Sequence, residues 1–217
     1  MGMKNTEFAK LVILINSAVP LGMLGYDAVR GQLGVNPIES AVHITGMLAL
    51  VFLFLSLAVT PLRLLTGKNW LSNFRRMLGL YAFFYGCVHF TTYFVFQRSL
   101  SFSGVVEDTV KRSFILLGMT ALILMVPLAI TSTAASVKRL GAVNWKRLHR
   151  LAYVSAICGA IHYYMSVKAD VRIPISFIIV LAVLLGYRLI GKRFNFARAK
   201  PVRVTSPASQ ATSSVGR

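Results

Sequence analysis

Six apolar stretches, each about 20 residues long, dominate the sequence and limit what the chain can fold into. A helix needs about 20 mostly apolar residues to cross the hydrocarbon core of a bilayer. The stretches lack the period-two alternation of a membrane β-barrel. We therefore expect an all-α membrane protein, a bundle of six transmembrane helices over residues 8–26, 42–60, 77–97, 113–132, 148–167 and 173–190. Pro61 is expected to stop the second helix, because proline cannot continue the helical hydrogen bonds.

The charged residues indicate how such a bundle would be oriented. The 217 residues include 24 Lys and Arg but only 6 Asp and Glu, for a formal net charge of +18. Because 56% of the residues are hydrophobic, the composition excludes a disordered chain and argues against a soluble nucleic-acid binder. With a cytoplasmic N-terminus, 18 of the 24 basic residues fall on the inner side. Lys and Arg favour cytoplasmic loops, so the sequence predicts an N-in, C-in topology.

The chain divides into one membrane domain and a short tail. Residues 1–194 are expected to form the six-helix transmembrane domain. Residues 195–217 are rich in Ser, Ala, Pro and Thr, so we expect a disordered cytoplasmic tail. The first apolar stretch resembles a signal peptide, but no clear cleavage site follows it, and it is interpreted as a retained helix.

Histidines are the candidate functional groups within the membrane. His43, His89, His149 and His162 all lie in or at the edge of apolar stretches, whereas no Asp or Glu lies near mid-membrane. Ionisable residues at membrane depth are costly and point to function. Imidazoles without carboxylates suit haem iron better than a proton pump or a cation transporter. On the expected topology His89 and His162 lie at similar depth on two helices, the arrangement of a bis-imidazole haem between helices.

A second haem would lie nearer the cytoplasm. His149 precedes His162 by 13 residues, or roughly 20 Å along a helix, although the two side chains would point about 140° apart. No second histidine is evident there, because His43 lies at the outer side and is interpreted as a hydrogen-bonding or propionate-contacting residue. The basic residues expected near this inner site are candidates for propionate or flavin contacts, or for membrane anchoring alone: Arg75, Arg76, Arg147 and Arg150.

Other redox motifs are missing from the sequence. There is no GxGxxG, no P-loop and no CxxCH, and Cys87 and Cys158 form no CxxC pair. The chain thus has no dinucleotide domain and no covalent haem attachment, and electrons must come from another molecule. Two further hypotheses remain open: a ferric reductase or other quinol-oxidising haem b protein, and a non-haem transporter or scaffold.

An ordered series of short motifs resembles a known family. The series runs Asn36-Pro37-x-Glu39, His43-x-Thr45-Gly46, Thr60-Pro61-Leu62-Arg63, Arg75-Arg76-x-Leu78-Gly79-Leu80, Tyr85-x3-His89, Lys111-Arg112, Leu128-Ala129-x-Thr131-Ser132, Leu140-Gly141, Trp145-x2-Leu148-His149-x3-Tyr153 and Ile161-His162-Tyr163. In order and spacing it is similar to the MsrQ (YedZ) family, the haem-binding membrane subunits of bacterial protein-methionine-sulfoxide reductases. That family lies within the ferric-reductase-like transmembrane superfamily.

The resemblance implies a function as well as a fold. It implies non-covalent haem b (one or two groups), with His89, His149 and His162 as axial ligands of the iron. It implies an electron-transfer subunit of an oxidoreductase in the bacterial inner membrane, delivering electrons to MsrP, a periplasmic molybdopterin subunit that repairs methionine sulfoxide in proteins. The implied donors are the quinone pool or a cytosolic flavin reductase, with FMN as a further cofactor. In oxidase relatives the third helix carries two histidines, whereas here Arg75 and Arg76 lie near the inner position.

Overall fold

The described part of the chain, residues 2–168 and 170–198 of a computed structural model, is helical and contains no β-strand. The helices are α1 (Gly2–Val29), α2 (Pro37–Thr66), α3 (Ser72–Thr92), α4 (Phe102–Lys111), α5 (Ser113–Ile130), α6 (Ala134–Leu140), α7 (Ala142–Leu148), α8 (Leu151–Ser166) and α9 (Arg172–Arg198). A 3-10 turn (Asn69–Leu71) precedes α3, and a π-helical turn (Tyr93–Gln97) follows it. The all-α fold class is confirmed for these residues.

Within the described part of the chain, five helical segments are long and apolar enough to span a membrane: Glu7–Val29, Pro37–Thr66, Asn69–Gln97, Ser113–Ile130 and Arg172–Ile190. The expected fifth span corresponds to α8, whose 16 residues give about 24 Å of helix. That length falls short of the hydrocarbon thickness of about 30 Å. The protein is therefore a multi-pass membrane protein with five clear candidate spans, and the six-span count stays a prediction.

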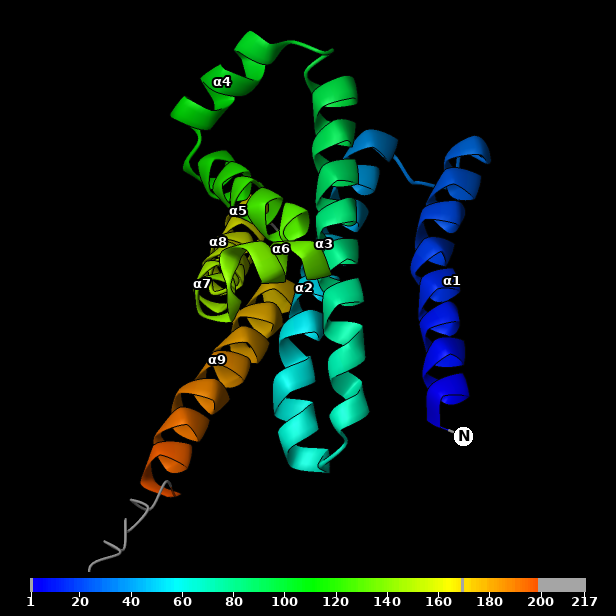
Figure 1. Ribbon diagram of the computed structural model, residues 1–217. Coiled ribbons are helices and arrows are strands. Elements are labelled where there is room, and N and C mark those ends of the chain that lie inside the picture. Colours follow the sequence, from blue (N-terminus) through cyan, green and yellow to red (C-terminus); the bar gives the residue numbers. More distant parts are fainter. Residues whose placement is uncertain (1, 169, 199–217) are drawn as a thin grey trace, which may run out of the picture.

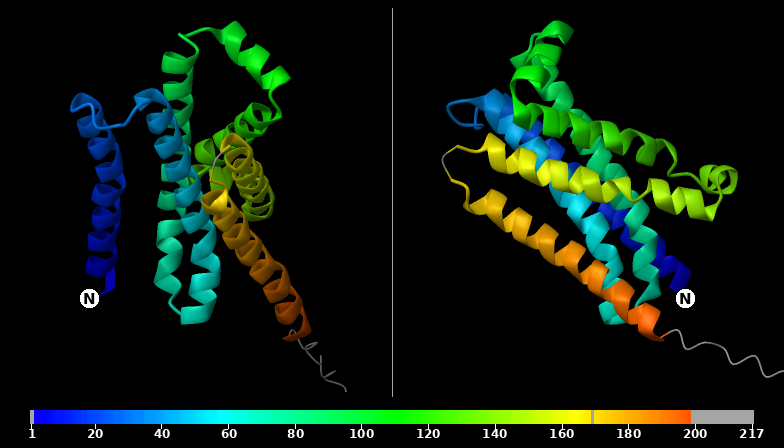
Figure 2. Two further views of the ribbon diagram at one scale, coloured as in Figure 1. Left: turned by 180° about the vertical axis from the view of Figure 1, so that it is seen from behind. Right: turned by 90° about the vertical axis from the view of Figure 1, so that its left-hand side faces the viewer.

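The helices run side by side as a tilted bundle (Figure 2). Two antiparallel pairs make the most extensive contacts, α2 with α3 and α5 with α8. Helix α1 stands at the side of the first pair, and α9 lies against α8 and α2 (Figure 1). The beginning of α1 and the end of α9 lie at the same end of the bundle, opposite α4 (Figure 1).

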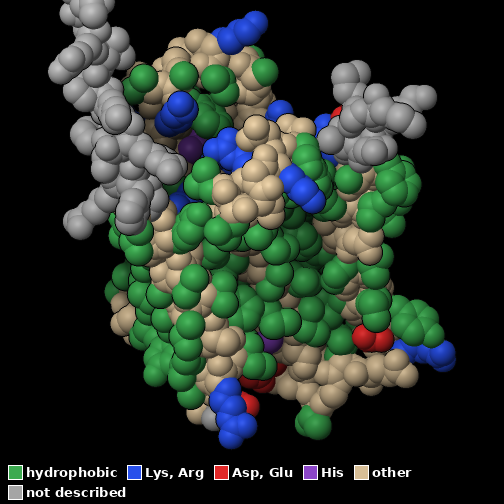
Figure 3. Space-filling view, turned by 90° about the horizontal axis from the view of Figure 1, so that it is seen from below, with side chains coloured by type: hydrophobic (Ala, Val, Ile, Leu, Met, Phe, Trp, Pro, Cys, Tyr) green, Lys and Arg blue, Asp and Glu red, His purple; other side chains and the backbone are tan. Residues whose placement is uncertain are grey.

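The bundle buries a core of apolar side chains and also leaves many large apolar ones exposed. Ala82 and Ala156 are fully buried, and Phe52 stacks on Tyr85 with ring centroids 5.3 Å apart. Leu14 and Val183, by contrast, are more than half exposed. A belt of apolar side chains crosses the molecule in Figure 3, with Lys and Arg gathered along one edge and most visible Asp and Glu along the other. Such a belt is the surface that lipid covers.

The end of α2 corrects one expectation. We expected Pro61 to stop this helix, yet α2 continues to Thr66 and ends at Gly67, whose φ of 69° needs a glycine-like conformation. Pro61 has no N–H to donate to the carbonyl of Leu57. Arg188 of α9 donates to that carbonyl oxygen instead, from Nη2 at 3.0 Å. The helix therefore continues because a side chain of another helix satisfies the freed acceptor.

Two further segments differ in extent from the expectation. The connection between the third and fourth predicted spans, residues 98–112, contains α4, which begins after the N-cap Ser101. Helix α9 reaches Arg198, so residues 195–198 of the expected tail are helical, because no proline or glycine interrupts the chain between Lys192 and Arg198. The remainder of that tail, residues 199–217, lies outside the described residues.

Candidate haem site between the helix pairs

A cavity of about 560 Å³ lies between the α2–α3 and α5–α8 pairs. Its walls are largely apolar, and three of the four histidines line it: His43, His89 and His162. The volume falls in the range of small-molecule and cofactor sites. The structure therefore brings together, in one cavity, the two histidines that were expected at similar depth.

His89 is held by α2, the partner of its own helix. Its Nδ1 lies 2.9 Å from the carbonyl oxygen of Val42. A carbonyl can only accept, so Nδ1 carries the proton and donates it, and Nε2 is left as the basic nitrogen. The ring lies against Gly46, where an added Cβ would come within 2.9 Å of ring atoms. Only glycine leaves room for the imidazole at this position.

His162 repeats this arrangement in the second pair. Its Nδ1 donates to the carbonyl oxygen of Phe114 at 2.6 Å, and its ring lies against Gly118, where a Cβ would come within 2.8 Å. In both pairs the acceptor carbonyl lies four residues before the glycine, one helical turn away. Each helix pair thus presents one imidazole with its Nδ1 engaged and its Nε2 unprotonated.

The two imidazoles lie close enough for one metal ion between them. Their ring centroids are 6.1 Å apart and their planes are inclined by 80°. Nitrogen–metal bonds of about 2 Å on each side account for such a separation, and a second hydrogen bond on the far ring nitrogen is typical of metal-bound histidine. No group of three or more His, Cys, Asp and Glu suited to a metal occurs among the described residues. The residues present thus fit a group that brings its own equatorial ligands, as haem does.

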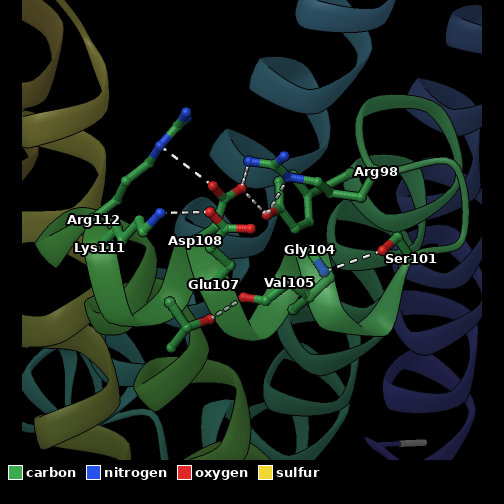
Figure 4. A network of polar contacts seen from close by, with 10 residues as sticks. Arg98, Ser101, Gly104, Val105, Glu107, Asp108, Lys111 and Arg112 are labelled. Carbon is green, nitrogen blue, oxygen red and sulfur yellow. Dashed lines mark hydrogen bonds and ion pairs between the residues drawn. The ribbon is translucent and has the colours of Figure 1, made fainter.

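The end of this cavity nearer α4, which is the outer end on the predicted topology, is polar and is covered by that helix. Asp108 of α4 is nearly buried and accepts a hydrogen bond from the Tyr93 hydroxyl at 2.6 Å. Arg98 pairs with the same carboxylate, and Arg112 approaches it with Nε at 3.4 Å (Figure 4). On the exposed side of α4, Lys111 lowers the pKa of the Glu107 carboxyl by a hydrogen bond and by its charge. His43 and Glu39 also line this end.

A second cavity, of about 320 Å³, lies toward the other end of the bundle. Arg75, Arg76, Trp145 and His149 are among the residues that line it. His149 is the one histidine on its wall, and its Nε2 lies 3.2 Å from the Thr131 hydroxyl. Trp145 stacks on the imidazole with centroids 3.9 Å apart and donates its indole N–H to the Thr131 carbonyl. His149 is thus engaged in a local polar network.

The structure separates the predicted residues into two groups and leaves two outside both. His43, His89 and His162 line the first cavity, which we call the outer cavity after the predicted topology. His149, Arg75 and Arg76 line the second, which we call the inner cavity. Arg147 and Arg150 line neither. The roles as iron ligands and as propionate or flavin contacts stay predictions.

Three features of the site were missed by the sequence analysis. Gly46 and Gly118 lie inside apolar stretches. A glycine at such a position is the one signal in the sequence that a side chain of another helix packs closely there. Asp108 is one of only six acidic residues in the sequence, and its spacing of four from Arg112 suggests a pair. Arg188 is a basic residue near the end of the last apolar stretch, and it donates to Leu57, Thr60 and Tyr153 within the bundle.

The comparisons with known proteins agree with this geometry. Residues 45–160 match the family described as "Ferric reductase like transmembrane component". A relative from Herminiimonas arsenicoxydans is 47% identical over 182 residues, 83% of this chain and 84% of its own length. Relatives from Rhodospirillum rubrum and Deinococcus radiodurans are 43% and 42% identical, over 85% and 91% of this chain and 88% and 93% of their own lengths. All three are named protein-methionine-sulfoxide reductase heme-binding subunit MsrQ. No solved structure matches the chain.

Helix pairs that enclose a histidine-lined cavity define a ferric-reductase-like transmembrane protein. Within that class, the family follows from the 42–47% identity to these three relatives over most of the chain. The chain belongs to the MsrQ family of heme-binding subunits.

Proposed function

We propose that this chain binds haem b in the outer cavity and carries electrons across the bacterial inner membrane to a periplasmic partner. The acceptor is the molybdopterin subunit MsrP, which reduces methionine sulfoxide in oxidised proteins. The chain is then the electron-transfer subunit of an oxidoreductase, and the substrate chemistry belongs to the partner. The relatives' name supports the haem and the reductase system.

The observation that carries this proposal is the matched setting of His89 and His162. Both imidazoles donate Nδ1–H to a backbone carbonyl, so both offer Nε2 to the space between them. A haem bound there supplies one-electron chemistry, because its iron cycles between the ferric and ferrous states. The chain's own residues fix the two rings, surround the site with apolar side chains and exclude water from it. These are the ways in which a protein tunes a haem potential.

The inner cavity is the proposed entry point for electrons. Arg75 and Arg76 line it and carry positive charge, and among the described residues only one imidazole, that of His149, reaches it. This set favours an anionic group, the phosphate of FMN, or a quinone headgroup over a bis-imidazole haem. A quinol or a cytosolic flavin reductase is the proposed donor. A second haem held by His149 is the alternative occupant.

The proposed topology has six spans with both termini in the cytoplasm. Helix α8 is the fifth of these six spans in chain order, and its shortness is compensated by local thinning of the bilayer. Its position beside α5, which is itself a clear candidate span, supports this assignment. The basic loops then lie inside, next to the inner cavity, in agreement with the positive-inside rule.

Haem content and redox spectra of the purified protein test the proposal. The wild type is expected to show a Soret band and a low-spin spectrum typical of two imidazole ligands. His89→Ala and His162→Ala should each lose this spectrum, whereas His43→Ala should keep it. A wild type without bound haem would contradict the proposal and support a non-haem transporter or scaffold. Full haem retention in His162→Ala would contradict the ligand pair.

The acceptor needs a separate experiment. Reduced protein in liposomes should be reoxidised by the periplasmic molybdopterin partner carrying oxidised methionine substrate, and far less by ferric chelates. Rapid reoxidation by ferric chelates alone would instead support the ferric reductase hypothesis.

A further inference from the structure

We propose that Arg98 and Arg112, at the outer mouth of the cavity, bind the carboxylates of the haem and so fix which way round it sits. This inference rests on the proposed haem site and gives a role to two residues to which neither the sequence motifs nor the relatives' names assign one.

The two ends of the cavity differ in charge. Its inner part is lined by apolar side chains such as Leu50, Leu53 and Met125, whereas its outer part is lined by Arg98 and Arg112. Ionised carboxylates in hydrocarbon are costly, so a ligand that carries them on one edge turns that edge toward charged or wet surroundings. The outer mouth is therefore the end that accepts the carboxylates.

Both guanidinium groups are positioned by contacts with Asp108 and still have N–H groups without a hydrogen-bond partner among the described residues. Arg98 donates Nε to the Tyr93 hydroxyl at 3.2 Å and pairs with Asp108 through Nη2 (Figure 4). Arg112 approaches Asp108 only through Nε. In the hydrogen bonds between described residues, both terminal amino groups of Arg112 and one of Arg98 have no partner. These are the donors that suit a carboxylate, because arginine can present two parallel N–H groups to it.

Asp108 acts here as a positioning residue. Its side chain is 7% exposed and lies between the two arginines, whose side chains are 28% and 55% exposed. One carboxylate facing two guanidinium groups leaves one positive charge uncompensated within this cluster. Glu39 lines the same end but bonds to Asn36 and lies near His43. The cluster of Tyr93, Arg98, Asp108 and Arg112 is thus a preformed site for an anion at the mouth of the cavity.

The test compares haem with its dimethyl ester, in which both carboxylates are neutral. Haem-depleted full-length protein in detergent is titrated with each, and binding is followed by the Soret band. Wild type should bind haem about tenfold more tightly than the ester, since charge-assisted hydrogen bonds are lost with the ester. Arg98→Gln/Arg112→Gln should bind both equally, and Arg112→Gln alone should show an intermediate ratio. The exposed Lys111→Gln, which does not line the cavity, should keep the wild-type ratio.

The outcomes separate this inference from the haem proposal itself. Equal binding of both ligands by wild type, or an unchanged preference in the double variant, would overturn the arginine assignment while leaving the haem site intact. A Soret band that stays at the position of the free ligand, with haem and with the ester alike, would overturn the haem site. The haem midpoint potential is a second readout: it should fall when the two positive charges are removed and stay unchanged in Lys111→Gln.

Discussion

Arg188 on α9 donates a hydrogen bond to the carbonyl of Leu57 on α2, the acceptor that Pro61 leaves without its helical partner. The same guanidinium donates to Thr60 at 2.8 Å and to the Tyr153 hydroxyl. One side chain therefore joins α2, α8 and α9 at a point where the helical hydrogen bonding of α2 is interrupted. Its Nε is buried without a partner among the described residues.

Arg188→Leu should lower the free energy of unfolding by about 1–3 kcal/mol, because it leaves the Leu57 carbonyl unsatisfied in an apolar setting. Pro61→Ala returns an N–H to that carbonyl, so the Arg188 substitution should cost less in the Pro61→Ala background. Unfolding in detergent micelles measures both. Pro127→Ala, a proline substitution on α5, is the matched control and should add to Arg188→Leu without coupling. Purely additive effects with Pro61→Ala would contradict the assigned contact.

Gly46→Ala and Gly118→Ala should each reduce haem content to less than about half of wild type. At an open helical position glycine to alanine stabilises by about 1 kcal/mol, but here the new methyl group meets the His89 or His162 ring at less than 3 Å. Pyridine haemochrome analysis gives the content, and the Soret position reports a displaced ligand. Gly186→Ala, which meets nothing within 4 Å, should retain haem. Normal spectra in both cavity variants would show that the rings can shift without cost.

Asp108→Asn should loosen α4. The substitution removes the charge that two arginines face and weakens the Tyr93 hydrogen bond, at a cost of about 1–3 kcal/mol. Limited proteolysis or hydrogen exchange should show faster opening of residues 98–112. The neighbouring Glu107→Gln removes an exposed pair with Lys111 and should leave stability essentially unchanged. Equal effects of the two substitutions would mean that the Asp108 cluster does not hold α4.

Neutralising the inner basic residues should slow electron entry. Arg75→Gln/Arg76→Gln should reduce the rate of donor-dependent haem reduction about tenfold or more, because two charges leave the wall of the inner cavity. Stopped-flow reduction by a flavin reductase or quinol measures the rate, while dithionite gives the total reducible haem. Adding Lys138→Gln and Arg139→Gln extends the test to the adjacent loop. Arg30→Gln, in the loop at the opposite end, should leave the rate unchanged.

Apolar runs and histidine spacing predicted the helical bundle and the meeting of His89 with His162, because both depend on length and depth alone. The path of α2 through Pro61 could not be predicted, since the side chain that replaces the missing N–H lies 127 positions later in the sequence. The contacts of Gly46 with His89 and of Gly118 with His162 could not be predicted either, because they depend on which helices pair. The short α4 is defined by its fit against the bundle, through Asp108, rather than by an apolar run.

Leu53 and Met125 line both cavities. The inner and outer cavities are therefore separated by a layer of side chains and not by the full hydrocarbon thickness of the bilayer. If the proposed cofactors occupy the two sides, this layer sets the distance an electron must tunnel. The distance that an electron crosses without a cofactor would then be much shorter than the thickness of the membrane, while the bundle would offer no path to ions or water.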